Sequence, residues 1–272
     1  MKIFIDSADI EHIEKARSYG ILDGVTTNPS LIKKAVTIRQ QRGDNVDMRS
    51  YIQSILEVAH DVPVSLEVIG TDRQQMEKEG RFLFETFNPI AGNVYVKIPV
   101  NPAFSRDDST HYDGIGTIKA LADDGIPVNC TLIFTPEQAL LAAKAGARVV
   151  SPFAGRIDDL LRTRNKIDFD KTDYFPAYGL DQGEATDDNG IVSGIDLVIQ
   201  CVEILKKFDF TCEVLAASIR NPRQTREAAL SGAHIGTLPF EVISQLLVHD
   251  KTMEGMRGFV KDVVPEYADL LS

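Results

Sequence analysis

The chain has 272 residues, of which 43% are apolar and 25% are charged, a composition typical of a globular protein with a substantial buried core. The 40 acidic and 29 basic side chains give a formal charge of −11. This acidity argues against a nucleic-acid or anionic-membrane partner, either of which would require clustered Lys and Arg. No apolar run approaches the roughly 18 residues of a membrane span.

The cysteines and the first residues of the chain indicate its expected cellular location. Cys130, Cys201 and Cys212 are widely spaced and form neither a disulfide framework nor a zinc-binding pair. A reducing environment is the expectation for such a chain. The chain begins with MKIFID, which lacks the regions of a signal peptide. We therefore expect an unprocessed, cytoplasmic protein.

Short runs rich in apolar and β-branched residues predict eight strands. They cover residues 2–6, 24–28, 64–68, 94–100, 128–134, 148–153, 213–218 and 234–239. Segments with helix signals separate them. Thr135-Pro136 and Gly146 bracket one such helix, residues 195–205 repeat apolar side chains at three- and four-residue steps, and Asn221-Pro222 opens another helix.

Strands that alternate with helices predict parallel βαβ units, and eight of them favour a closed (β/α)8 TIM barrel. A doubly wound sheet would require a G-x-G-x-x-G turn after an early strand, and the sequence has none. We expect one barrel domain over residues 1–272, with a polar, acidic insertion at about 157–192 after strand six. Residues 168–189 hold seven acids and one lysine, which indicates a solvated loop of functional or disordered character.

Side chains of a barrel strand alternate between the surrounding helices and the barrel interior. In residues 94–100 the apolar Val96 and Ile98 suit the helix side, so Lys97 points inward. One interpretation is a structural lysine paired with an acid. The other is a catalytic amine, because burial disfavours an ammonium and a neutral amine attacks a carbonyl carbon to form a Schiff base.

The same alternation turns polar side chains inward near the C-terminal ends of the other strands, where the active sites of such barrels lie. This inward set comprises Asp6, Thr26, Asn28, Ser65, Glu67, Asn129, Thr131, Ser151, Phe153 and Ser218. Arg156 and Arg220 follow strands six and seven. Two arginines and a hydroxyl at one rim predict a phosphate clamp, because arginine forks match phosphate oxygens.

A Schiff base makes the adjacent carbon an electron sink, which suits aldol cleavage and addition. Asp6 or Glu67 can take the hydroxyl proton at the breaking bond, and Glu67 with Thr131 can hold water. Asn28 and Asn129 can bind substrate hydroxyls. The five histidines show no metal-ligand spacing, so we expect no metal site.

Seven segments together resemble the transaldolase family, which also includes the fructose-6-phosphate aldolases. They are residues 5–6 (ID), 24–31 (GVTTNPSL), 65–68 (SLEV), 96–99 (VKIP), 129–134 (NCTLIF), 151–158 (SPFAGRID) and 216–221 (AASIRN). They follow the family order over about residues 1–239. No single segment is specific, whereas the ordered set is.

The resemblance implies a (β/α)8 enzyme that moves a dihydroxyacetone unit from fructose 6-phosphate to erythrose 4-phosphate, without a metal or cofactor. Lys97 would form the Schiff base, Asp6 would be the acid and base, and Glu67 and Thr131 would hold the catalytic water. Sugar phosphates would be the partners, and a homo-oligomer is expected. The implied and predicted substrate-binding residues are Thr26, Asn28, Asn129, Ser151, Phe153, Arg156, Ser218 and Arg220.

Two positions favour a transaldolase over an aldolase. Aldolase-type members tend to carry Gln in place of Glu67 and Tyr in place of Phe153. A lyase that releases free dihydroxyacetone, and a transaldolase-like enzyme on a modified sugar phosphate, stay open as alternatives. A non-catalytic sugar-phosphate sensor also stays open, because a fold alone does not fix function.

Overall fold

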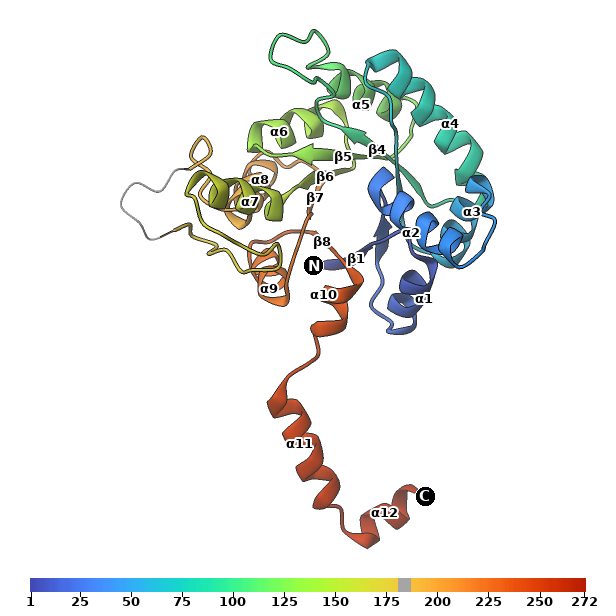
Figure 1. The fold of residues 1–272 in the computed structure, drawn as a ribbon, viewed down its shortest axis with the longest axis vertical. Helices are drawn as coiled ribbons and strands as arrows, with labels where there is room; N and C mark the ends of the chain where they lie inside the picture. Colours follow the sequence, from blue (N-terminus) through green and yellow to red (C-terminus); the bar gives the residue numbers. More distant parts are fainter. Residues whose placement is uncertain (181–186) are drawn as a thin grey trace.

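The computed structural model describes residues 1–180 and 187–272. Within these ranges, parallel strands pair in chain order and β1 also pairs with β8, so the sheet closes into a barrel surrounded by helices (Figure 1). The strands are β1 Lys2–Asp6, β2 Gly24–Thr26, β3 Val64–Glu67, β4 Val94–Pro99, β5 Val128–Ile133, β6 Val149–Pro152, β7 Glu213–Ala216 and β8 Ile235–Leu238. The predicted (β/α)8 fold and the eight predicted strands are confirmed.

Helices cover the outside of the barrel and continue beyond its last strand (Figure 1). They are α1 Ile10–Ser18, α2 Pro29–Gln41, α3 Met48–Val58, α4 Arg73–Ala91, α5 Asp113–Asp123, α6 Pro136–Ala145, α7 Ala154–Arg164, α8 Gly194–Lys207, α9 Pro222–Leu230, α10 Phe240–Gln245, α11 Asp250–Lys261 and α12 Pro265–Leu271. The signals at α6 act as predicted: Thr135 and Gln138 form a capping box, and Gly146 ends the helix with φ +104°.

The apolar core has two parts. Residues such as Val96 and Ile98 of β4 are fully buried between the strands and the helices. A separate, smaller cluster of inward residues fills the barrel interior; it comprises Phe4, Val149, Leu215, Ala217 and Ile235, with Tyr95 and Phe153 packed against it. The interior is therefore sealed by apolar side chains, and the polar inward residues are left at the C-terminal ends of the strands.

The predicted insertion begins later than expected, because residues 157–164 belong to α7, which follows β6 directly. The helix was not recognised from the sequence because its buried face is not purely apolar. Asp158 and Arg162 lie on that face and are only 3% and 4% exposed. The connection to α8 is not wholly solvated either, since Phe175 and Ala177 are buried. Residues 181–186 of the predicted insertion lie outside the described residues.

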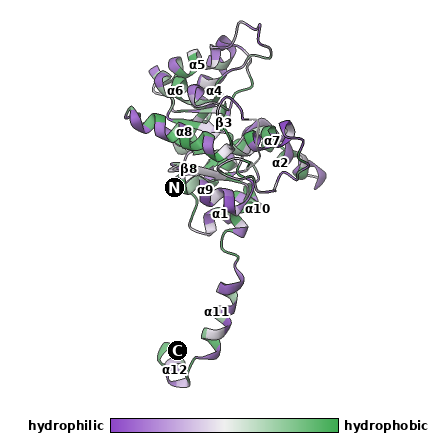
Figure 2. Ribbon diagram, turned by 90° about the vertical axis from the view of Figure 1, so that its left-hand side faces the viewer, coloured by the Kyte–Doolittle hydropathy of each residue, from purple (hydrophilic) through white to green (hydrophobic). Residues whose placement is uncertain are grey.

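The C-terminal helices α11 and α12 extend away from the barrel (Figure 1). Neither helix has a buried residue, and apolar and polar residues both occur along them (Figure 2). Phe259 and Leu270 are about three quarters exposed, at 74% and 77%. Of the helices in residues 1–180 and 187–272, none combines the length and the apolar character that crossing a membrane would require.

Candidate active site

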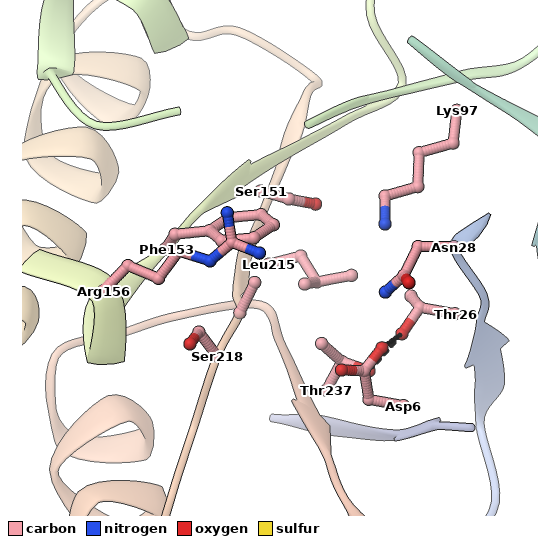
Figure 3. A pocket seen from close by; sticks show the side chains of 11 residues that line it. Asp6, Thr26, Asn28, Lys97, Ser151, Phe153, Arg156, Leu215, Ser218 and Thr237 are labelled. Atoms are coloured by element: carbon pink, nitrogen blue, oxygen red, sulfur yellow. Dashed lines mark hydrogen bonds between the residues drawn. The ribbon is translucent and has the colours of Figure 1, made fainter. Parts of the chain in front are cut away.

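A cavity opens at the C-terminal ends of the strands and collects most of the predicted site residues (Figure 3). The predicted residues that line it are Asp6, Thr26, Asn28, Lys97, Ser151, Phe153, Arg156 and Ser218. Three residues outside the prediction, Leu215, Ala217 and Thr237, complete the lining. Thr237 could have been found from the sequence, because it occupies an inward position in the last predicted strand.

Lys97 lies in β4 and is 4% exposed, with its side chain in the cavity. Its Nζ donates a hydrogen bond to the Thr27 carbonyl at 3.1 Å and lies 3.1 Å from Oε2 of Glu67. The strand register explains this ion pair, because Glu67 of β3 is directly opposite Lys97. The amine thus has a neighbouring carboxylate that can accept its proton.

Asp6 ends β1 on the other side of the cavity from Lys97 (Figure 3). The Thr26 hydroxyl donates to Oδ1 of Asp6 at 2.7 Å and lies 2.6 Å from the Thr237 hydroxyl. When Asp6 is ionised it can only accept, so the single proton of the Thr26 hydroxyl goes to Asp6 and Thr26 accepts a hydrogen bond from Thr237. Burial raises the pKa of Asp6 above its ordinary value, although Lys97, Thr26 and Arg156 act in the opposite direction. A carboxyl group of this kind suits proton transfer nearer to neutral pH.

Two predicted site residues of β5, Asn129 and Thr131, are buried and do not line the cavity themselves. Ser151 donates to Oδ1 of Asn129 at 2.7 Å, and Nδ2 of Asn129 donates to Ser65 at 3.1 Å. The Thr131 hydroxyl is buried and has no hydrogen-bond partner among the described residues. A buried hydroxyl without a partner in the protein marks a place where a water or a ligand atom would be stabilised.

The backbone of β5 is irregular beside Thr131. The pairing of β5 with β6 shifts register between Cys130 and Ile133, and the intervening Leu132 has φ +58°. Bulges and left-handed backbone in residues other than glycine recur next to functional sites, where they redirect a side chain. This irregularity is invisible to the alternation pattern, which assumes regular strands.

Asn28 has a structural role as well as a place in the cavity. It is the N-cap of α2, and its Oδ1 accepts a hydrogen bond from the Leu31 amide at 2.9 Å. Pro29 follows at the first helical position, so the local sequence fixes this cap. The amide nitrogen of Asn28 is left on the cavity side as a donor (Figure 3).

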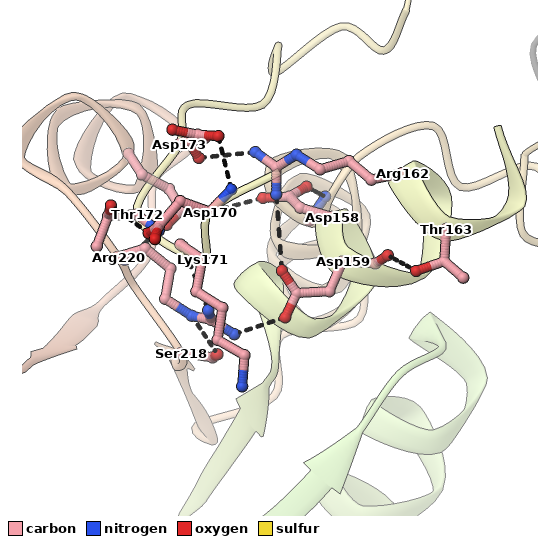
Figure 4. Close-up of polar contacts among 12 residues, drawn as sticks. Asp158, Asp159, Arg162, Thr163, Asp170, Lys171, Thr172, Asp173, Ser218 and Arg220 are labelled. Carbon is pink, nitrogen blue, oxygen red and sulfur yellow. Dashed lines mark hydrogen bonds and ion pairs between the residues drawn. The ribbon is translucent and has the colours of Figure 1, made fainter. Parts of the chain in front are cut away.

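The two rim arginines differ in their surroundings. The Arg156 guanidinium lies 4.9 Å from the centre of the Phe153 ring and forms no ion pair with any described residue. Arg220 does not line the cavity; its Nη2 donates to Asp159 at 2.9 Å and its Nε to the Ser218 hydroxyl at 3.2 Å (Figure 4). Ser218, with φ +61° just after β7, connects Arg220 to the cavity.

Asp159 is a residue of this rim that the sequence did not reveal. It follows the buried Asp158 on α7, and its partner Arg220 is 61 residues away in the chain. Close packing of α7 on this rim also depends on Gly155, since a Cβ there would lie 2.2 Å from the Ser218 carbonyl oxygen and 2.7 Å from Nε of Arg220. In residues 1–180 and 187–272, His, Cys, Asp and Glu form no group of three that could hold a metal ion.

The fold and the cavity together define a class: a (β/α)8 barrel with a buried amine beside one carboxylate, a second carboxylate in the same cavity, and arginines on the rim. Such a site is suited to covalent chemistry on a carbonyl compound that carries an anionic group.

Comparison with known proteins identifies the family within that class. The family described as transaldolase/fructose-6-phosphate aldolase matches residues 3–268. A probable transaldolase of Aquifex aeolicus is 40% identical over 268 residues, which cover 98% of this chain and 99% of that protein. Probable transaldolases of Chlorobium phaeobacteroides and Clostridium perfringens are 40% and 37% identical over 262 residues; these cover 96% of this chain in both, and 96% and 97% of the two relatives. The chain belongs to this family of enzymes.

Proposed function

We propose that the protein is a transaldolase that transfers a dihydroxyacetone unit from fructose 6-phosphate or sedoheptulose 7-phosphate to aldose phosphates through a Schiff base on Lys97. The observation that carries this proposal is the pair formed by the buried amine of Lys97 and Glu67 at 3.1 Å, with Asp6 in the same cavity. Family membership supports it. Glu67 and Phe153 favour transfer of the dihydroxyacetone unit over its release, because aldolase-type members of the family tend to carry Gln and Tyr at these two positions.

The donor half of the reaction begins at C2 of the sugar. Lys97, after giving a proton to Glu67, attacks the carbonyl carbon, and the carbinolamine loses water to form an iminium ion. Asp6 then takes the proton of the C4 hydroxyl as the C3–C4 bond breaks. The electron pair of that bond passes into the iminium to give an enamine, and the aldose phosphate leaves as an aldehyde.

The acceptor half reverses these steps on another aldehyde. The enamine carbon attacks the aldehyde carbon of the acceptor, and Asp6 returns its proton to the new alkoxide. Water then adds to the iminium and releases the product ketose, with Lys97 restored. Glu67 and Thr131 hold this water, a role supported by the unpartnered Thr131 hydroxyl among the described residues.

Recognition of the sugar phosphate is divided between the wall and the rim of the cavity. Asn28, Asn129 and Ser151 bind donor hydroxyls, and Thr26 keeps Asp6 in place through its 2.7 Å hydrogen bond. Phe153 supports the Arg156 guanidinium. Arg156, Ser218 and Arg220 bind the phosphate, as the planar guanidinium favours.

An acceptor-dependence assay tests the reaction type. With fructose 6-phosphate and erythrose 4-phosphate, we expect sedoheptulose 7-phosphate and glyceraldehyde 3-phosphate in equal amounts. With fructose 6-phosphate alone, we expect at most one equivalent of glyceraldehyde 3-phosphate per site. Continuous accumulation of free dihydroxyacetone without an acceptor would contradict the transferase proposal and establish a lyase.

Borohydride trapping tests the covalent step independently of the acceptor. Reduction in the presence of fructose 6-phosphate is expected to leave a three-carbon adduct on Lys97, identified by peptide mass spectrometry. The matched control is Lys144, an exposed lysine in the last turn of α6, which should carry no adduct. Binding of the sugar without any adduct would support the sensor alternative instead.

We further propose a homo-oligomer whose subunits are single domains, in a reducing cytosolic location. The exposed apolar residues of α11 and α12, such as Phe259 and Leu270, support a self-association surface, and the three free, buried cysteines support the location. Light scattering should show an oligomer that Phe259→Glu with Leu270→Glu dissociates. Lys261→Glu, a charge change on α11 itself, serves as the control, and an unchanged mass in the double variant would refute this surface.

A further inference from the structure

We infer that the connection between α7 and α8 supplies a further phosphate-binding residue, Lys171, to the rim of the active site. The inference deepens the proposed function, because it concerns how the same site distinguishes a phosphorylated sugar from an unphosphorylated one. One turn of this connection, residues 170–173, is attached to the barrel beside Arg220.

The turn is ordered by its own side chains. The amide of Asp170 donates to Oδ2 of Asp173 at 2.8 Å, and the amide of Thr172 donates to Oδ1 of Asp170 at 2.9 Å. These two bonds close the turn on itself. The backbone of Lys171 is therefore held at the tip of a defined loop.

Two elements of the barrel anchor the turn. Arg162 of α7 is buried between the rings of Phe169 and Phe175, at 4.9 and 5.1 Å, and donates to the Asp173 carbonyl at 2.7 Å. Asn221, the N-cap of α9, donates to the Thr172 carbonyl at 3.2 Å. The turn thus has a fixed position beside the start of α9, where Arg220 lies.

The turn contacts Arg220 directly. Nη1 of Arg220 donates to the Lys171 carbonyl at 3.3 Å, and the Lys171 side chain runs past the guanidinium in the direction of Ser218 (Figure 4). An extended lysine reaches about 6 Å from its Cα. Its ammonium group can therefore contact a phosphate held by Ser218 and Arg220.

The ion pairs at the rim leave Lys171 as a positive charge that can balance the phosphate of a substrate. A sugar phosphate carries between about 1.5 and 2 negative charges at neutral pH. Arg220 is compensated by Asp159 at 2.9 Å, and Arg162 shares the same carboxylate at 3.6 Å. Arg156 and Lys171 are in no ion pair with a described residue. They supply the positive charge that the compensated Arg220 lacks.

The test uses steady-state kinetics of the full-length enzyme with two donors, fructose 6-phosphate and unphosphorylated fructose. For Lys171→Met, the KM for fructose 6-phosphate should rise about five- to tenfold with kcat close to wild type. The kcat/KM for fructose should not change. Lys171→Arg should restore most of the affinity, and Lys166→Met, an exposed lysine in the same connection, should behave as wild type.

Inorganic phosphate provides a readout that needs no turnover. Its dissociation constant, measured by calorimetry, should rise by a similar factor in Lys171→Met and stay unchanged in Lys166→Met. An unchanged constant, or equal losses with both donors, would overturn the assignment of Lys171. This outcome is separate from a failure of the proposed function, which would appear as the absence of a Lys97 adduct while phosphate still binds in a Lys171-dependent manner.

Discussion

The two ends of the active site are built from different parts of the fold. At the lysine end, Asp6, Glu67 and Lys97 all lie in strands and are held by their neighbours in the sheet, at 2.7 Å for Thr26 with Asp6 and 3.1 Å for Glu67 with Lys97. At the other end, where we propose that the phosphate binds (the phosphate end), the cations lie at helix starts and in the connection between α7 and α8. They are held by α7 and by the turn at residues 170–173.

This difference matches two tasks. Covalent chemistry needs fixed distances between reacting groups, and neighbouring strands of a closed barrel supply them. Recognition of a substrate's far end varies more readily in loops and helix termini, because changes there leave the sheet intact. We therefore expect changes at the lysine end to lower kcat and changes at the phosphate end to raise KM.

The largest effect is expected at Lys97. Lys97→Met removes the proposed nucleophile and keeps most of the volume of the side chain, so turnover should fall by at least about 10³-fold while circular dichroism stays that of the native fold. Lys97→Arg is the matched variant, since it keeps a charge near Glu67 without an amine that forms a Schiff base. Near wild-type turnover in either variant would end the covalent proposal.

The second-largest effect on turnover is expected at Asp6. Asp6→Asn should lower kcat about 10²-fold, since one general acid–base group is lost. The pKa of Asp6 is raised by burial, so the ionised form that accepts the C4 proton is depleted at a higher pH than for an ordinary carboxyl group. The wild-type rate should therefore fall on acidification in a limb that Asp6→Asn lacks; a limb retained by this variant would assign it to another group.

A smaller effect is expected at the phosphate end. Arg220→Ala should raise the KM for fructose 6-phosphate about tenfold, because hydrogen bonds to a charged group are lost, and should change kcat less. Arg220→Lys should be intermediate, since an ammonium group cannot reach Asp159, Ser218 and the Lys171 carbonyl together. Equal losses with unphosphorylated fructose would show that Arg220 supports the fold instead.

The smallest effect on turnover is expected at Asp158, which acts through stability. Its oxygens accept hydrogen bonds from the Gly194 amide at 2.7 Å and from Gln224 at 2.8 Å. Burial raises the pKa of Asp158 to about 7, above the value of about 3.9 in an unfolded chain. The folded state therefore binds the extra proton, and the free energy of unfolding falls as the pH rises from about 4 to 7.

Urea denaturation between pH 4.5 and 8 tests whether the free energy of unfolding falls as the pH rises. The contribution of Asp158 to that fall is at most about 4 kcal/mol, from a shift of about three pKa units. Asp158→Asn should flatten the dependence of the unfolding free energy on pH over this range. Glu203→Gln, at an exposed position of α8, should leave it unchanged, and a steep curve in Asp158→Asn would assign the dependence to other groups.

The inward residues at the lysine end could be predicted because the side chains of a strand alternate between its two faces with a period of two residues. The pleat of a strand places every second side chain in the barrel interior, so the inward positions of Lys97 and Asp6 could be predicted from the sequences of their own strands. The pairing of Lys97 with Glu67 did not follow, since it depends on the register of β3 against β4. Thr131 was predicted to face inward, but the bulge beside it and its unpartnered hydroxyl were not predictable from an alternation pattern.

The sequence by itself determined the order of the eight strands, the closed barrel, and which residue types turn inward at its mouth, because these follow from the local alternation of side chains along each strand. Only the tertiary structure decided that Arg220 is paired with Asp159, that α7 buries charged side chains, and that residues 170–173 dock beside the phosphate end. Those contacts join segments that lie about 10 to 60 residues apart. No local pattern records such contacts, because their energy depends on burial and on partners that exist only in the folded chain.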